Sequence, residues 1–437
     1  MNDNIIIRHG YKYRLRTQPR HEILLRQYAG SCRYVWNKAL ALQQARHAAG
    51  EQYANYIAMA KWLTQWRNNQ AFLKVVPVHA LQATLKDLDQ AFQRFFKSAG
   101  GYPRFKSRQD AMSFSEPDVA CFKVDEARSQ IRLPKLGWVR YRNSQPIAGS
   151  LRNLTVSHNA LGWHVSIQTE IETPKPIPVA TSIAAGDRGI SQFITLSNGT
   201  FVAPLNAHQR MMQRLTRYQR SCARKVEAQK RAAGIIGAMP KGMRLPVSQR
   251  LKLARKRVAS LQAKIARSRT DFLHKLSTDL ADQHAVFVLE DLRVKNMTAS
   301  SKGDAAAPGR NVRQKAGLNR SILDQGWAMF ETQLEYKMHE RGAEVIYVPP
   351  HYTSQRCHAC GYTDVLNRNK ARFACLACGH CNHADTNAAK NILAAGHAVL
   401  AGRSALSATS CYADVEDMVQ SDQPVKRQPT KDVRCAG

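Results

Sequence analysis

The sequence is short of acidic side chains and has no long apolar run. Its 437 residues include 32 Asp and Glu against 65 Lys and Arg, which gives a formal net charge of +33. This deficit of acids excludes the near-neutral surface of an ordinary enzyme and favours a polyanionic partner, above all nucleic acid. Because no apolar run reaches about 18 residues, we expect no transmembrane helix and no membrane partner.

The sequence also lacks the marks of a secreted protein. Its first residues, MNDNIIIRHG, do not contain the apolar core of a signal peptide. Five of the ten cysteines lie between residues 357 and 381, and the others are scattered, which is not a disulfide framework. We therefore expect a protein of the reducing cytoplasm, with room for roughly three domains.

The clustered cysteines form two matched Cys-x-x-Cys-Gly turns. Cys357 and Cys360 make the first, Cys375 and Cys378 make the second, and 14 residues separate them. Two such turns place four thiolates around one tetrahedral ion, so the spacing predicts a structural Zn²⁺. Cys381 could replace one of these ligands, and His358, His380 and His383 are further candidates. The repeated C-x-A-C-G shape favours the first four cysteines.

The first part of the chain alternates between strand and helix patterns. Residues 4–16 alternate apolar and basic side chains, as a strand with one buried face does. Residues 22–98 carry apolar residues at helical spacing, and residues 129–173 return to short strands. We expect one small β-barrel from residues 1–21 and 99–180, with a helical bundle inserted at 22–98. Residues 174–180, PKPIPVA, are typical of a linker.

The most basic stretch covers residues 207–269, which contain 18 Lys and Arg and one acid, Glu227. Prolines at 240 and 246 predict two antiparallel helices. On the first helix, Met211, Leu215, Tyr218 and Cys222 are expected on the packed face, and Arg210, Arg214, Arg217 and Arg224 on the opposite face. A charge run is often only a solvated face, but so many uncompensated cations favour a nucleic-acid surface.

Three acids occur where a regular element is expected to end or begin. Asp187 ends an apolar strand, Glu290 ends a second strand, HAVFVLE, and Asp385 opens a helix that follows the cysteines. This order is the layout of an RNase H-like nuclease domain. Carboxylates suit Mg²⁺, and two such ions activate water and stabilise the leaving oxygen of a phosphodiester. Each acid alone would fit a helix cap or a surface carboxylate equally well.

Residues 5–396 resemble a known family, the TnpB (OrfB) proteins of bacterial insertion sequences, which are compact relatives of the type V CRISPR effectors. The resemblance rests on several motifs in order: YKYRLRTQP at 11–19, RYVWNKAL at 33–40, GYPRFKS at 101–107, GDRGI at 186–190, VLEDL at 288–292, LNRSILDQGW at 318–327, YTSQRCHACG at 352–361 and HADTNAAKNI at 383–392.

The resemblance implies a multidomain α+β architecture. It implies a split wedge β-barrel around a helical recognition bundle, then an RNase H-like (RuvC) α/β nuclease domain at 181–396 with an inserted zinc ribbon at about 351–384. Residues 397–437 are expected to be a disordered tail, because the basic signal vanishes there.

The resemblance also implies an activity, RNA-guided cleavage of double-stranded DNA in the bacterial cytoplasm at the nucleoid. A guide RNA copied from the end of the insertion sequence pairs with the target beside a short flanking motif. Asp187, Glu290 and Asp385 take the catalytic, Mg²⁺-binding positions, and the four cysteines take the zinc positions. Two alternatives are a DNA transposase that uses the same acids and an RNA-guided regulator that does not cut.

Basic and aromatic residues in the first half of the chain are the predicted nucleic-acid contacts outside the basic stretch. Backbone phosphates attract cations and bases stack on aromatic rings. The predicted residues are Lys12, Arg14, Arg33, Tyr102, Arg104, Phe105 and Lys106.

Overall fold

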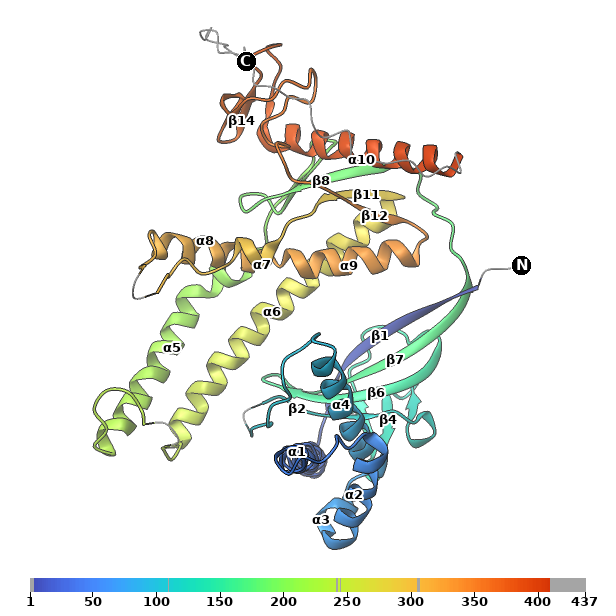
Figure 1. Ribbon diagram of the computed structural model, residues 1–437, viewed down its shortest axis with the longest axis vertical. Coiled ribbons are helices and arrows are strands. Elements are labelled where there is room, and N and C mark those ends of the chain that lie inside the picture. Colours follow the sequence, from blue (N-terminus) through green and yellow to red (C-terminus); the bar gives the residue numbers. More distant parts are fainter. Residues whose placement is uncertain (1–3, 109, 241–242, 244, 305–306, 409–437) are drawn as a thin grey trace. The chain divides into compact units, whose positions relative to one another are not determined.

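The computed structural model describes residues 4–108, 110–240, 243, 245–304 and 307–408 (Figure 1). The chain divides into two compact units, Met1–Lys175 and Pro176–Gly437. The division falls close to residue 181, where the second half was predicted to begin. Among the described residues, every helix is too short or too polar to cross a membrane.

The first unit contains one seven-stranded antiparallel sheet. Its strands are β1 (Asn4–Arg16), β2 (Met112–Glu116), β3 (Lys123–Asp125), β4 (Gln130–Leu133), β5 (Gly137–Tyr141), β6 (Ser150–Asn159) and β7 (Gly162–Pro174), in the order β2-β6-β7-β1-β5-β4-β3. The alternation predicted for 4–16 is confirmed at its end, where Tyr13 and Leu15 are buried and Lys12 and Arg14 are exposed. Closure of this sheet into a barrel stays a prediction.

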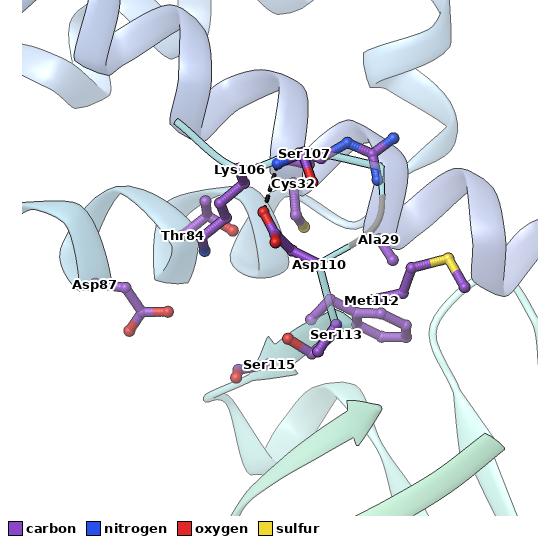
Figure 2. A pocket seen from close by; sticks show the side chains of 13 residues that line it. Ala29, Cys32, Thr84, Asp87, Lys106, Ser107, Asp110, Met112, Ser113 and Ser115 are labelled. Atoms are coloured by element: carbon purple, nitrogen blue, oxygen red, sulfur yellow. Dashed lines mark hydrogen bonds between the residues drawn. The ribbon is translucent and has the colours of Figure 1, made fainter. Parts of the chain in front are cut away.

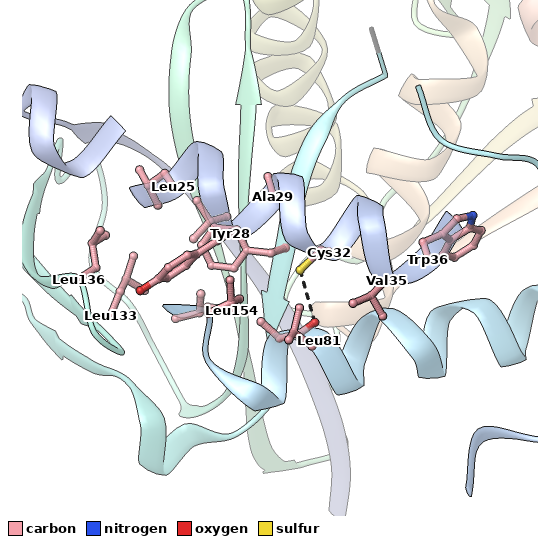
Figure 3. Packing of buried hydrophobic residues seen from close by; sticks show 14 of the residues in the cluster. Leu25, Tyr28, Ala29, Cys32, Val35, Trp36, Leu81, Leu133, Leu136 and Leu154 are labelled. Atoms are coloured by element: carbon pink, nitrogen blue, oxygen red, sulfur yellow. Dashed lines mark hydrogen bonds between the residues drawn. The ribbon is translucent and has the colours of Figure 1, made fainter. Parts of the chain in front are cut away.

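Helices pack on this sheet to form a single core with it (Figure 3). They are α1 (Pro19–Ala48), α2 (Tyr56–Asn69), α3 (Ala71–Val75) and α4 (Val78–Phe96), and a 3-10 turn, η1 (Val119–Cys121), follows β2. Leu25, Tyr28 and Val35 of α1 are fully buried, as their helical spacing predicts, and Figure 3 shows them facing Leu81 of α4 and Leu133 and Leu154 of the sheet.

Two expectations for this bundle are corrected. Helix α1 begins at Pro19 rather than at residue 22, because proline fixes the φ angle of a first helical turn and needs no amide partner there. Phe95 continues the helical spacing of apolar residues in 78–95, which predicts a packed side chain, but it remains 38% exposed. Its ring contacts Tyr102 edge-on at 5.2 Å between centroids. Helical periodicity identifies the apolar face of a helix, but it does not show how far along the helix that face is covered by other parts of the protein.

The second unit is built on a five-stranded mixed sheet in the order β10-β9-β8-β11-β12. The strands are β8 (Ile183–Arg188), β9 (Ile194–Leu196), β10 (Phe201–Val202), β11 (Val286–Glu290) and β12 (Glu344–Val348). Strand β11 runs parallel to β8 on one side and to β12 on the other, whereas β9 and β10 are antiparallel neighbours.

Helices cover both faces of this sheet, which gives a three-layer α/β arrangement. The helices are α5 (Ala207–Ala232), α6 (Gln249–Gln283), α7 (Val294–Met297), α8 (Val312–Gln325), α9 (Trp327–Glu340) and α10 (Ala384–Ala408). Phe287 and Leu289 of β11 pack with α6 and α9, while Val288 of the same strand packs with Ile392 of α10. Helices α5 and α6 extend from the sheet as a hairpin (Figure 1), as the prolines predict.

A three-stranded ribbon links β12 to α10. It consists of a 3-10 turn, η2 (Val365–Asn367), and strands β13 (Arg368–Asn369), β14 (Arg372–Ala374) and β15 (Cys381–His383). Its small core contains Cys357, Phe373, Cys375 and Ala384. Strand β15 ends at His383, and α10 begins at the next residue, Ala384.

The predicted start of a disordered tail at residue 397 is wrong. Helix α10 continues to Ala408, and Val399 and Leu400 pack beside the sheet cluster that contains Ile392. Gly396 supports this packing, because a Cβ there would lie 2.4 Å from Val288 Cγ2. The composition of residues 397–408 did not indicate a helix, because the helix is stabilised by packing against strand β11, which is distant in sequence. The rest of the predicted tail, 409–437, lies outside the described residues.

Candidate metal centres and nucleic-acid surfaces

Two of the three predicted acids lie side by side on neighbouring parallel strands. The register pairs Val286 with Ile183 and Leu289 with Gly186, so Glu290 and Asp187 are the next residues on β11 and β8. At equal register on parallel strands, both side chains leave the same face of the sheet. This is the α10 face, since Ala185 and Val288, two residues earlier on each strand, pack with Ile392.

The third acid, Asp385, is the second residue of α10, the helix that covers this face. Its Oδ1 accepts a hydrogen bond from Arg368 Nη2 of the ribbon at 2.9 Å. Glu290 Oε1 accepts one from Thr353 Oγ1 at 2.7 Å. The structure thus brings the three acids to one region, although they do not form one of the groups whose ligand atoms all lie within 4.8 Å of one another.

The pKa shifts of the acids indicate that their carboxyl groups are buried and repel one another. Burial, and after it the neighbouring carboxylates of Glu290 and Asp385, raise the pKa of Asp187 to about 7 against the lowering effect of Arg368 and Arg188. Burial also raises the pKa of Glu290, whose side chain and backbone are together 7% exposed. A bound cation would relieve this repulsion, and a set of three carboxylates is the donor set that Mg²⁺ prefers.

Sequence reasoning missed Arg188, which follows Asp187 and holds the strand ends together. Its side chain is fully buried, forms an ion pair with Glu331 of α9, and donates a hydrogen bond to the Glu290 carbonyl oxygen. A basic residue beside a buried acid was a visible signal, but Glu331 is too distant in sequence to be identified as its partner.

We expect Arg188→Met to destabilise the second unit by about 2–4 kcal/mol, because the substitution leaves the buried Glu290 carbonyl oxygen without this donor and the half-buried carboxylate of Glu331 without its cation. Denaturant unfolding measures this free energy. The matched control is Lys275→Met, which breaks the exposed ion pair between Lys275 and Asp271 and should cost less than about 1 kcal/mol. Equal losses for the two variants would contradict a structural role for Arg188.

The four predicted cysteines come together in the ribbon. Cys357 Sγ lies 3.8 Å from Cys378 Sγ, and Cys360 Sγ lies 3.5 Å from Cys375 Sγ. Zn–S bonds of about 2.3 Å in a tetrahedron require sulfur atoms about 3.8 Å apart. The four thiols therefore form a cluster that can hold a structural zinc ion, and Cys381 is not part of it.

The two cysteine turns share one backbone geometry. Gly361 N donates to Cys357 O at 2.9 Å, and Gly379 N donates to Cys375 O at 3.0 Å. Both glycines have φ angles in the left-handed region, +79° and +72°, which explains why glycine closes each motif.

Two asparagines, four residues apart on α10, tie this helix to the start of the ribbon. Asn387 and Asn391 both donate to the Arg356 carbonyl oxygen at 2.7 Å, and Asn391 also donates to Thr353 O at 2.8 Å. Thr353 in turn donates to Glu290. The ribbon, the helix with Asp385 and the strand with Glu290 are thus connected by hydrogen bonds, so ribbon folding and acid placement depend on each other.

The predicted contacts in the first unit are mostly exposed. Tyr102 and Phe105 are 42% and 51% exposed, and Lys12, Arg14 and Arg104 also face solvent. Arg33 is half-buried.

The loop 101–107 is fixed to helix α1 by two residues that sequence reasoning missed. Trp36 Nε1 donates to Arg104 O at 3.0 Å, and Asn37 exchanges two hydrogen bonds with the Lys106 backbone at 2.8 and 2.9 Å. The Lys106 ammonium lies 3.8 Å from the centre of the Trp36 ring. A small polar pocket beside this loop is lined by Cys32, Arg33, Thr84, Asp87, Lys106 and Asp110 among others (Figure 2).

The basic hairpin presents all four predicted arginines of its first helix to solvent. Arg210, Arg214, Arg217 and Arg224 are exposed, and Arg214 Nε donates to Tyr218 Oη at 3.1 Å. Leu215 is buried against Leu261 and Ile265 of α6, as predicted. Met211 is instead 41% exposed, which corrects its assignment to the packed face: near the start of α5 that face is only partly covered.

Three family models match parts of the chain. One, described as "Probable transposase", matches residues 166–301, and one described as "Cas12f1-like, TNB domain" matches 327–392, which includes the ribbon. A third, described as "Helix-turn-helix domain", matches 4–52, although in this structure those residues form strand β1 and the single helix α1.

Full-length relatives give a stronger comparison. The chain is 42% identical over 429 residues to InsQ of Escherichia coli (strain K12), which is named as an RNA-guided DNA endonuclease, and the match covers 98% of each chain. A Streptomyces pristinaespiralis protein with the same kind of name is 29% identical over 437 residues, or 97% of each chain.

Among solved structures, a Cas12f1 in complex with sgRNA and target DNA aligns with 85% of this chain and 82% of its own, at 14% identity and a TM-score of 0.47, too low to establish a shared architecture. The sequence match to InsQ over nearly the whole of both chains is decisive, and the chain belongs to the OrfB transposase family of insertion sequences, the TnpB family.

Proposed function

We propose that this protein is an RNA-guided DNA endonuclease of a bacterial insertion sequence, and that Asp187, Glu290 and Asp385 form its catalytic centre. The observation that carries the proposal is the convergence of these acids: two end neighbouring parallel strands and one opens the helix that covers them. The 42% identity to InsQ supports the activity class.

The three carboxylates would hold Mg²⁺, which supplies an activated water and stabilises the leaving oxygen of the phosphodiester. The chain's own residues orient those carboxylates. Thr353 fixes one oxygen of Glu290, and Arg368 fixes one oxygen of Asp385. Arg188 holds the Glu290 backbone beside β8. The four ribbon cysteines would hold Zn²⁺ and so place the start of α10.

This function assigns roles to the two units. The five-stranded sheet with its helices and ribbon would be the RNase H-like (RuvC) nuclease domain, residues 181–396 extended by the end of α10. The first unit would be the wedge barrel, residues 1–21 and 99–180, with the recognition bundle 22–98 inserted. The mixed sheet order β10-β9-β8-β11-β12, with the acids on β8 and β11, supports the nuclease assignment.

Base pairing with a guide RNA would select the target, and the protein would hold the heteroduplex by its backbone. A net charge of +33 supports a polyanionic partner of this size. The contacts we propose in the first unit are the exposed side chains of β1 and the loop that Trp36 and Asn37 fix to α1. The contacts we propose in the second unit are the exposed arginines of α5.

Changing Arg210, Arg214, Arg217 and Arg224 together to glutamine is expected to weaken nucleic-acid binding with little dependence on sequence. Each lost duplex phosphate contact removes about 0.9 from the slope of log affinity against log salt, so the slope should flatten by up to ~4. Binding measured at several salt concentrations gives this slope. Folding should persist, because Leu215 carries the packing and glutamine is a good helix former.

A control with the same charge change separates this surface from general charge loss. Lys61, Lys74, Lys275 and Arg313 are exposed cations on helices outside residues 207–269 and can be changed to glutamine together. If that variant flattens the salt slope as much as the arginine variant, or if the arginine variant keeps the original slope, α5 is only a solvated face.

The experiment that tests the function starts from protein purified with its bound nucleic acid. We expect a copurifying RNA that contains a segment derived from the insertion-sequence end, and Mg²⁺-dependent cuts in DNA that matches its guide. A transposase would instead join DNA strands, and a non-cleaving regulator would bind the matched DNA without cutting it. Either of those results would overturn the proposal.

A further inference from the structure

A second group of metal-ligand side chains lies in the first unit, which contains neither the acids nor the ribbon. His79, Asp118 and Cys121 each offer a ligand atom within 4.8 Å of the other two. Asp118 Oδ2 lies 4.0 Å from His79 Nε2 and 3.4 Å from Cys121 Sγ. His79 belongs to the first turn of α4, Asp118 caps the turn η1 after β2, and Cys121 is the last residue of η1.

The backbone presets the carboxylate of this group. Asp118 Oδ1 accepts a hydrogen bond from Ala120 N at 3.0 Å, which leaves Oδ2 directed at the histidine and the cysteine. In protein metal sites, such a hydrogen bond to a ligating carboxylate fixes its orientation before the ion binds. His79 and Asp118 side chains are both 41% exposed, so an ion can reach them from solvent.

A buried carboxyl group lies two residues before Asp118 in sequence, and the described residues offer it no hydrogen-bond partner. Glu116 precedes Asp118 by two residues, is 1% exposed, and neither of its side-chain oxygens has a hydrogen-bond partner among the described residues. Burial of a polar group without a hydrogen-bond partner is costly, so this part of the fold is open to a further polar or ionic partner.

We propose that His79, Asp118 and Cys121 form a second metal site, for a borderline divalent transition ion of the Zn²⁺ class, which clips helix α4 to the turn after β2. A ligand set of one imidazole, one carboxylate and one thiolate suits zinc or cobalt, whereas magnesium and calcium prefer oxygen alone. Bonds of about 2.0–2.3 Å in a tetrahedron separate ligand atoms by about 3.3–3.8 Å. The 3.4 Å between Asp118 Oδ2 and Cys121 Sγ falls in this range, and the 4.0 Å between Asp118 Oδ2 and His79 Nε2 is slightly longer.

With three protein ligands, one position of a tetrahedral site stays open to water. The competing explanation needs no ion: Asp118 caps the turn η1, and the thiol and imidazole only surround it. The two explanations differ in whether the protein takes up a thiolate-bound ion at this place.

Co²⁺ is the probe that tests the site, because thiolate–Co²⁺ bonds give a charge-transfer band in the near ultraviolet. Full-length protein, already loaded with zinc at the ribbon, is titrated with Co²⁺. We expect one equivalent to bind with this band in the wild type. Cys121→Ser should abolish the band, and His79→Gln should weaken binding at least tenfold.

Three further variants keep the test decisive. Asp118→Asn retains an oxygen that accepts from Ala120, so the turn persists while the ionic ligand is lost, and Co²⁺ should bind at least tenfold more weakly. Cys222→Ser removes a half-buried cysteine on α5, and Glu290→Gln removes an acid that could bind Co²⁺ without a thiolate. Neither of these should change the band. The proposal is overturned if the wild type shows no band. It is also overturned if the band survives Cys121→Ser, because Co²⁺ that exchanges with zinc at the ribbon cysteines would give such a band.

Discussion

Glu290→Gln is expected to reduce DNA cleavage by about a thousandfold or more while leaving the affinity for matched DNA nearly unchanged. Loss of one carboxylate from a Mg²⁺ centre removes several kcal/mol of transition-state stabilisation, and each 1.36 kcal/mol is a factor of ten in rate. Single-turnover cleavage rates and DNA-binding measurements on the same preparations report the two effects.

The substitution should not unfold the protein. Glutamine retains an oxygen that can accept the hydrogen bond from Thr353, and a neutral side chain relieves the repulsion that the carboxylate of Asp187 exerts. Asp187→Asn and Asp385→Asn should give the same loss of cleavage.

Asp291→Asn is the matched control for Glu290→Gln, since Asp291 is the next residue along the chain and is exposed. It should cut DNA at the wild-type rate. If Glu290→Gln cuts normally, or if Asp291→Asn is equally impaired, the assignment of the catalytic acids is wrong.

The second large effect is expected from Cys357→Ser, which should lose the ribbon zinc and with it most DNA cleavage. Structural zinc contributes roughly 10–16 kcal/mol of binding free energy in zinc-finger peptides, so the ribbon should not fold without its ion. Cys357 is fully buried in the ribbon core, and the last ribbon strand ends two residues before Asp385 on α10. Metal analysis of purified protein should therefore find one zinc fewer per chain.

Two other cysteine variants serve as controls for Cys357→Ser. Cys222 lies on α5, outside the ribbon, so the Cys222→Ser variant should retain the ribbon zinc and the cleavage activity. Cys381→Ser should also retain the ribbon zinc, because Cys381 is not among the four clustered thiols. If Cys381→Ser loses the ion and Cys378→Ser retains it, the ligand set is wrong.

The parts of this site that could be predicted from sequence are those with short-range signals. The ribbon follows from two identical Cys-x-x-Cys-Gly turns, whose glycines adopt the left-handed conformation that the turn requires. Glu290 follows an unbroken apolar run, so its place at a strand end was visible. The alternation of apolar and basic residues in β1 predicted that Tyr13 would be buried and Arg14 exposed.

The parts that could not be predicted depend on partners far apart in sequence. Arg188 and Glu331 are 143 residues apart, and nothing in either neighbourhood identifies the other. Trp36 and Asn37 hold a loop about 70 residues away by its backbone, which carries no sequence signal. The end of α10 was missed for the same reason, because its apolar residues are covered by strands of the central sheet.

A guide-exchange experiment tests the central claim most directly. The protein is assembled with its copurifying RNA or with the same RNA carrying a new guide segment, and each complex is given DNA that contains both matching sites with the same flanking motif and Mg²⁺. We predict that the cut moves with the guide and disappears in Glu290→Gln. A cut that stays in place when the guide is exchanged, or that persists in Glu290→Gln, would contradict RNA-guided cleavage by these acids.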